Sequence, residues 1–179
     1  MGKNVSVLDL MCKEKNDEAN NHKTARDRFS ADAKNWVLKR DLYRERSKQE
    51  YADAQIYRKK RDEFNVKVKE FKAKRDEFQA KAAELKENRG PAYDEARAKG
   101  NEYHEMMIEA NTKGQEAHQK FAALMDQSNT DRVLADAAHK KFIECRKAAD
   151  EEHKLFLESL QSVKDLRDNL PEFDSEEDP

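Results

Sequence analysis

The sequence contains few glycines, prolines and cysteines and no long apolar segment. Its 179 residues include 4 Gly, 3 Pro and 2 Cys. Two cysteines are too few for a disulfide framework, which fits a reducing compartment. No segment approaches the roughly 20 apolar residues of a membrane-spanning helix, and no signal-peptide core is present. We therefore expect a cytoplasmic protein without an integral membrane span.

The composition excludes a compact globule and also argues against disorder. Charged residues make up 41% of the chain and hydrophobic residues only 36%, whereas an average domain has about 25% charged residues. A disordered chain of this kind usually has a high net charge, but 36 basic and 38 acidic side chains give a net charge of −2. Few helix-breaking residues and this balance indicate long helices.

Aromatic residues in the first half of the sequence recur every seven positions. Seven of the eight aromatics before residue 90 lie on one such line, and only Tyr51 does not. A sustained heptad predicts a coiled coil. The aromatic residues on the line are Phe29, Trp36, Tyr43, Tyr57, Phe64, Phe71 and Phe78.

The second half of the sequence has two heptad lines, one through Phe121 and one through Ala117. Between the halves, Gly90-Pro91 is typical of a turn between two helices. We predict an all-α fold, a long antiparallel two-helix coiled-coil hairpin. Its expected segments are a lead-in (1–12), a first arm (13–88), a turn (89–91), a second arm (92–170) and an acidic flexible tail (171–179).

Folding the sequence at residue 89 places large residues of one arm opposite small residues of the other. Such pairing fills a seam without voids. It also explains why glycines occur inside a helix. The polar residues match too, which predicts a weak, hydrated layer near the middle of the hairpin. The expected pairs are Phe64 with Gly114, Phe78 with Gly100, Arg26 with Glu152, and Ser47 and Glu50 with Ser128 and Asp131.

Charge is divided unevenly between the halves. Residues 1–90 carry 24 basic and 17 acidic side chains, and residues 91–179 carry 12 and 21. One interpretation is that opposite charges select the antiparallel pairing of the arms. The other concerns a basic strip on the first arm, which suits contact with a phosphate backbone. The strip consists of Arg58, Lys59, Lys60, Arg61, Lys67, Lys69, Lys72, Lys74 and Arg75.

The sequence contains no pattern typical of a catalytic or metal site. His104, His118, His139 and His153 share one heptad position but lie 14 or 21 residues apart. Helical neighbours at that spacing are about 21–32 Å apart, too far for joint metal coordination. We interpret them as solvated flank positions. Phosphate loops, nucleophile motifs and an enclosing pocket are not indicated either, so we expect no enzyme activity, metal or cofactor.

Two repeats of Lys-Arg-Asp-Glu-Phe, at residues 60–64 and 74–78, resemble an archaeal family of uncharacterised coiled-coil proteins with KRDEL-type heptad repeats. Residues 138–142 and 149–153 resemble the second arm of that family. The chain has Phe where the family commonly has Leu. A more distant similarity to polysome-associated coiled-coil proteins implies a role in translation or in a ribonucleoprotein. No functional residue is carried over from either resemblance.

Together these features favour a non-enzymatic rod that binds RNA or the ribosome through the basic strip. Because the aromatics are assigned to the seam, we expect recognition by shape and charge and not by base sequence. A protein–protein scaffold or spacer without RNA affinity is the alternative. Separately, a two-helix seam leaves the aromatics partly exposed, which is compatible with a homodimer along the rod. A membrane-peripheral adaptor is a third hypothesis, since Gly2 and Ser6 match the loose pattern for N-myristoylation.

Overall fold

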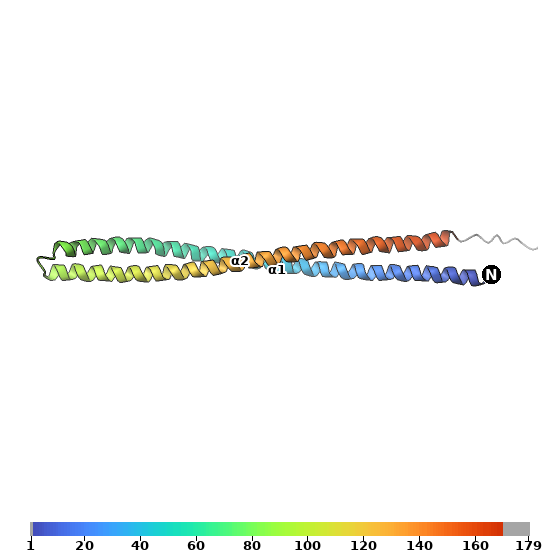
Figure 1. Ribbon diagram of the computed structural model, residues 1–179, viewed down its shortest axis with the longest axis horizontal. Helices are drawn as coiled ribbons and strands as arrows, with labels where there is room; N and C mark the ends of the chain where they lie inside the picture. The colour runs from blue at the N-terminus through green and yellow to red at the C-terminus, as the bar shows by residue number, and fades with distance from the viewer. Residues whose placement is uncertain (1, 170–179) are drawn as a thin grey trace, which may run out of the picture. The chain divides into compact units, whose positions relative to one another are not determined.

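The protein consists of two helices, α1 (Gly2–Glu84) and α2 (Pro91–Asp168), with no strand among residues 2–169 (Figure 1). The structure is a computed structural model that describes the backbone of residues 2–169 and the side chains of residues 7–169. The predicted all-α helical hairpin is confirmed. The predicted acidic tail (171–179) and the side chains of the possible acylation segment at Gly2 and Ser6 lie outside the described residues.

The helix boundaries differ from those predicted. Residues 2–12 belong to α1 and do not form a separate lead-in, because no Gly or Pro interrupts the helix after its first residue. α1 ends at Glu84, so residues 85–90 form a connection longer than the predicted turn at 89–91. The Asn88 amide donates to the Leu85 carbonyl at 3.1 Å, which tightens the chain after the helix. The Asp94 amide donates to the Gly90 carbonyl at 3.1 Å, with Pro91 as the first helical residue of α2.

The chain forms two compact units, each made from one segment of each helix. We call residues 43–133 the turn unit, since it contains the connection between the helices. The terminal unit comprises residues 1–42 and 134–179, of which residues 2–42 and 134–169 are described.

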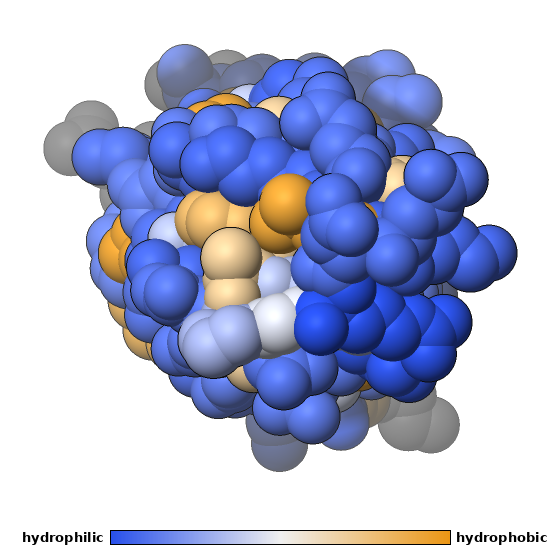
Figure 2. Space-filling view, turned by 90° about the vertical axis from the view of Figure 1, so that its left-hand side faces the viewer, coloured by the Kyte–Doolittle hydropathy of each residue, from blue (hydrophilic) through white to orange (hydrophobic). Residues whose placement is uncertain are grey.

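Small residues form most of the buried part of the seam in both units. The large aromatics of α1 are half-buried beside them. α1 contributes a second line of seam residues, seven positions apart at each step, in which small residues or a valine separate the arginines. We call it the inner line, which consists of Ala19, Arg26, Ala33, Arg40, Ser47, Ala54, Arg61, Val68, Arg75 and Ala82. The buried apolar residues are Ala19, Ala33, Ala54, Ala96, Ala110, Ala117, Ala135, Ala138, Ala149 and Val163. Helices whose contact residues are this small can approach closely, and most other side chains remain on the surface. Figure 2 looks onto the turn end and shows a mainly hydrophilic surface.

The large-to-small pairs predicted around the glycines are confirmed. A Cβ atom on Gly114 would lie 3.4 Å from Phe64 Cβ, and one on Gly100 would lie 3.7 Å from Phe78 Cβ. The glycines therefore lie directly against the first atoms of the aromatic side chains that cross the seam, at distances where an added Cβ would make van der Waals contact. These pairs set the register of the turn unit.

The predicted polar pairs are only partly correct. Ser47 Oγ donates to the Ser128 carbonyl at 2.9 Å, as expected for the middle of the hairpin. The predicted contact of Arg26 with Glu152 is wrong, because Arg26 contacts His153 and its own neighbour Asp27. Glu152 instead contacts His22. An arginine on the inner line reaches sideways out of the seam, where its guanidinium remains in contact with water.

The fit at Gly114 predicts that a larger residue there weakens the turn unit. Gly114→Leu should lower the free energy of unfolding by about 1–3 kcal/mol through overpacking against Phe64. Phe64→Ala in the same chain should recover part of that loss, because the two side chains compete for one space. Gly100→Ala is the control, with a new Cβ at an ordinary 3.6 Å from Gln79 Cγ. It should gain up to about 1 kcal/mol in helix propensity. Urea unfolding measures these three variants and the Phe64→Ala single variant; strictly additive losses at Gly114 and Phe64 would contradict this register.

Candidate nucleic-acid interface

The nine residues of the predicted basic strip do not share one surface. Arg61 and Arg75 lie on the inner line of α1, with side chains only 24% and 17% exposed. Lys74 pairs with Glu77 on the same helix at 3.7 Å. The remaining six are exposed. Among them, Lys60 lies over the Tyr57 ring and Lys67 over the Phe64 ring, whereas the other four lie over no aromatic ring within residues 7–169. These six are Arg58, Lys59, Lys60, Lys67, Lys69 and Lys72.

Lysines of both helices meet over the seam aromatics on one flank of the turn unit. Tyr57 lies between Lys60 of α1 and Lys120 of α2, whose Nζ atoms are 5.1 and 5.3 Å from the ring centroid. Phe78 is contacted in the same way by Lys81 and Lys99, each at 5.5 Å. An ammonium group over a ring face is attracted by the π-system. We call this flank the lysine face, which consists of Lys60, Lys67, Lys81, Lys99, Lys113 and Lys120.

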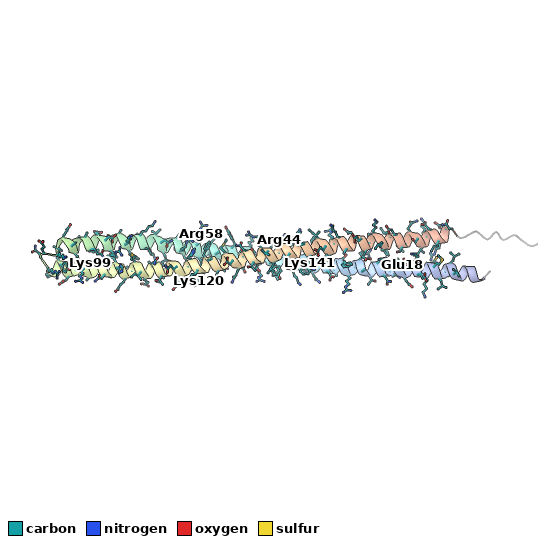
Figure 3. The ribbon with its side chains drawn as sticks, in the orientation of Figure 1. Glu18, Arg44, Arg58, Lys99, Lys120 and Lys141 are labelled. Carbon is teal, nitrogen blue, oxygen red and sulfur yellow. The ribbon has the colours of Figure 1, made fainter. Side chains whose placement is uncertain are left out.

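A shallow groove of about 410 Å³ runs along the lysine face. Lys60, Lys113 and Lys120 line it, with Tyr57 and Phe64 among the residues of its wall. Two carboxylates, Glu63 and Glu116, also line the groove. Figure 3 labels Arg58 on α1 and Lys120 on α2, two basic side chains on neighbouring helices of this unit. The sequence prediction considered only the first arm, and it missed the lysines that α2 adds.

Arginine–histidine clusters occupy the seam in both units. In the turn unit, Arg61 Nη1 donates to His118 Nδ1 at 3.1 Å, and Arg61 Nη2 donates to Asp62 at 3.1 Å. The guanidinium carbon lies 5.4 Å from the centroid of the Phe121 ring. Arg75 repeats the pattern with Asp76, His104 and Met107 in place of the phenylalanine. In the terminal unit the clusters are Arg40 with Asp41, His139 and Phe142, and Arg26 with Asp27, His153 and Phe156.

Three of the four histidines are exposed, as expected for flank positions, and His139 is half-buried. The clusters add that each histidine also contacts the other helix. Each Nδ1 atom accepts a hydrogen bond from an arginine of the other helix, at 2.9–3.1 Å. An arginine cannot accept a hydrogen bond, so the histidine nitrogen must carry no proton in this arrangement. The histidines therefore link the two helices. Among the residues whose side chains are described, no group of three His, Cys, Asp or Glu could hold a metal ion.

Direct ion pairs between the helices are few within residues 7–169. Arg46 of α1 contacts Asp131 of α2, and His22 contacts Glu152. The other ion pairs join residues of one helix, for example Lys113 with Glu109 at 3.1 Å. The opposite charges of the two halves are thus not paired as a ladder across the seam. Seam packing and the arginine–histidine clusters connect the helices.

A buried polar layer lies near the end of the turn unit that is farthest from the connection. Ser47 and Ser128 each donate the hydroxyl proton to the backbone carbonyl of the other at 2.9 Å, and their two Oγ atoms are 2.9 Å apart. Asp131 is only 3% exposed and faces Glu50. Its Oδ2 atom is 3.4 Å from Arg46 Nε but is not aligned for a hydrogen bond, and Glu50 Oε2 is also buried without a partner. Unpaired carboxylate oxygens of this kind reduce stability.

Burial raises the pKa of Glu50 above its usual range, and the adjacent Asp131 carboxyl raises it further. The charge of Arg46 acts in the opposite direction and is the smallest of these effects. A protonated Glu50 can donate to the neighbouring carboxylate, which removes one of two like charges from the seam.

Residues 89–178 match the family of unknown function DUF7121, and the match covers half of the chain. It extends over α2 and the residues that follow it. No curated protein and no solved structure is significantly similar to the chain. No helix among the described residues is long and apolar enough to cross a membrane.

The raised pKa of Glu50 predicts a pH-dependent gain from its removal. The folded chain binds this proton more tightly than the unfolded chain. That contribution to stability is therefore full below the unfolded value near 4.5 and is lost as pH rises through the folded pKa. At pH 7, Glu50→Gln should raise the free energy of unfolding by on the order of 1 kcal/mol. Urea unfolding should show the gain shrinking toward pH 4.5. The exposed Glu70→Gln is the control, and an equal gain in that variant would refute the explanation.

The clusters predict that a positive charge at a histidine position weakens the hairpin. His118→Lys places a cation beside Arg61 and removes its acceptor, so the free energy of unfolding at pH 7.5 should fall by about 0.5–1 kcal/mol. His118→Gln keeps a side-chain oxygen that can accept from Arg61 and should lose less. Urea unfolding compares the two variants. Equal losses would show that the Arg61 contact contributes nothing.

Proposed function

The chain belongs to the family of unknown function DUF7121, and we propose that it is a non-enzymatic RNA-binding hairpin that contacts phosphates through the lysine face. The observation that supports this most directly is the position of Tyr57 between Lys60 and Lys120. These two lysines come from different helices and form no ion pair among the residues with described side chains. Their charges are therefore available to an anionic partner.

Stacking over the rings makes the lysine face suited to phosphate. Each ring attracts a lysine ammonium group to the edge of the seam, so less side-chain freedom is lost on binding. Lys60 and Lys67 are one heptad apart, about 10 Å along the helix. Such a series of point charges attracts a nucleic-acid backbone without reading its bases, and the resulting affinity falls as salt rises.

Structured RNA within the ribosome or another ribonucleoprotein is the partner we propose. The resemblance of residues 55–160 to archaeal coiled-coil proteins, and more distantly to polysome-associated ones, supports testing the ribosome first. In this proposal Arg58, Lys59, Lys69 and Lys72 contribute a general positive field, while Arg61 and Arg75 hold the seam together.

A protein scaffold is the second candidate, favoured by an apolar groove in the terminal unit. The groove measures about 520 Å³, and Ala33, Val37 and Phe142 lie in its wall. Leu38 beside it is 68% exposed, which is high for a leucine. A pull-down with and without nuclease separates the candidates, because a protein partner bound through this groove would remain after RNA is digested.

The RNA proposal is tested by charge reversal on the lysine face. Fluorescence anisotropy with a labelled duplex RNA of about 20 base pairs measures affinity at several salt concentrations. The triple variant Lys60→Glu, Lys67→Glu, Lys120→Glu should bind at least about tenfold more weakly. The slope of log affinity against log salt should fall by about 2–3, since each phosphate contact contributes slightly less than one.

The matched control reverses three exposed lysines of the same unit that lie away from the lysine face, Lys59→Glu, Lys69→Glu and Lys72→Glu. Both triple variants change the net charge equally. An equal loss in both would show that only total charge matters, and binding that does not respond to salt would reject the proposal.

A further inference from the structure

Tyr51 is the one aromatic of the first half of the chain that does not lie on the heptad line, and its position corrects the expectation that every aromatic is used in the seam. Its side chain is exposed, with 46% of the residue's surface accessible. The ring lies beside a groove of about 340 Å³, lined otherwise by Arg44, Ser47, Lys48 and Arg132. All five residues belong to the turn unit.

The groove opens where the arginine–histidine pattern is replaced. Ser47 occupies the heptad position of the inner arginines, and Lys48 stands where the acceptor aspartates follow them. Arg132 occupies the histidine position, two heptads after His118 and one before His139. Ser47 is buried against Ser128 and is too short to cover the surface. A compact, nearly neutral cluster thus becomes an open site with two cations, and Arg44 adds a third.

These three cations are not neutralised by neighbours. Neither Arg44, Lys48 nor Arg132 takes part in an ion pair among residues 7–169, and the groove lining includes no carboxylate. The inner arginines behave differently, since Arg61 is bound by Asp62 and His118. The groove therefore combines an exposed ring with unpaired guanidinium and ammonium groups from both helices.

We infer that this groove is a binding site for single-stranded RNA, in which one base stacks on Tyr51 and the adjoining phosphates bind Arg44, Lys48 and Arg132. Aromatic side chains stack on any base, and arginine forks bind phosphate oxygens through paired hydrogen bonds. This inference rests on the proposed function and adds a second contact to it. In the heptad, Tyr51 and Lys60 lie on opposite flanks of the seam, so a duplex on the lysine face does not block the groove.

The terminal unit provides an internal comparison for the site. Its apolar groove has the same construction, with Ala33 in the inner position, Lys34 after it and Arg146 in the histidine position. Val37 and Ser30 stand there in place of Tyr51 and Arg44, and Asp150 lies in the wall. The one ring in this wall, Phe142, is a half-buried seam residue, whereas Tyr51 is exposed. A groove without an exposed ring and with a carboxylate should not bind a nucleotide. The comparison therefore attributes nucleotide binding to Tyr51 and Arg44, and not to the loss of an arginine–histidine cluster alone.

The test measures binding of a labelled oligouridine of about 10 nucleotides to the full chain by anisotropy. Tyr51→Ala should weaken binding by about fivefold or more, while Tyr51→Phe should bind like the unchanged protein because it keeps the ring. Tyr51→Leu should resemble Tyr51→Ala if stacking is required. Arg132→Gln should weaken binding and lower the salt slope by slightly less than one. Melting curves check that each variant remains folded, and Val37→Ala is the control in the terminal unit.

Two outcomes separate this inference from the proposed function. If duplex RNA binds through the lysine face but Tyr51→Ala binds oligouridine unchanged, the site at Tyr51 is overturned and the proposed function stands. If the Lys60, Lys67 and Lys120 variant binds duplex RNA normally while Tyr51→Ala loses oligouridine, the site stands and the lysine face is overturned. No binding of either RNA would overturn both.

Discussion

The arrangement of the protein depends on large residues of α1 packing against small residues of α2. Phe64 packs directly against Gly114, where an added Cβ would lie 3.4 Å from Phe64 Cβ, and nine of the ten buried apolar residues are alanines. A seam of small residues brings the helix axes close together. Side chains at its edges can then reach rings of the opposite helix, as Lys120 reaches Tyr57. The basic surface that we propose for RNA is thus a consequence of the packing.

The inner arginines give the seam a second function beyond packing. Their stems fill the space between the helices, and their guanidinium groups emerge on the flank to bind an aspartate and a histidine. This satisfies the donors and leaves little net charge. Where Ser47 and Arg132 replace that arrangement, the flank opens and positive charge remains. Surface chemistry therefore varies along the helices while the seam stays regular.

Much of the fold could be predicted because heptad periodicity is a local property that a sequence displays directly. The hairpin, the Gly114 and Gly100 pairs and the polar layer at Ser47 followed from counting. The arginine–histidine clusters did not, although the sequence contains their signal. Arg-Asp pairs begin at residues 26, 40, 61 and 75, at intervals of 14, 21 and 14, and the four histidines repeat those intervals in reverse. The arginines and the histidines can be matched only when both are known to lie on the same flank of the seam, and that depends on how the helices pack.

The sequence by itself determined that two long helices pair antiparallel and in which register, since the positions of aromatics, glycines and serines allow few other arrangements. Only the tertiary structure decided which charged side chains are available. A count of charges does not distinguish the arginines Arg61 and Arg75 from the lysines Lys60 and Lys67. In the structure, the two arginines are held in clusters with low exposure, and the two lysines lie over aromatic rings at the surface. The reason is physical: a side chain's accessibility depends on neighbours from the other helix, and these are far away in the sequence.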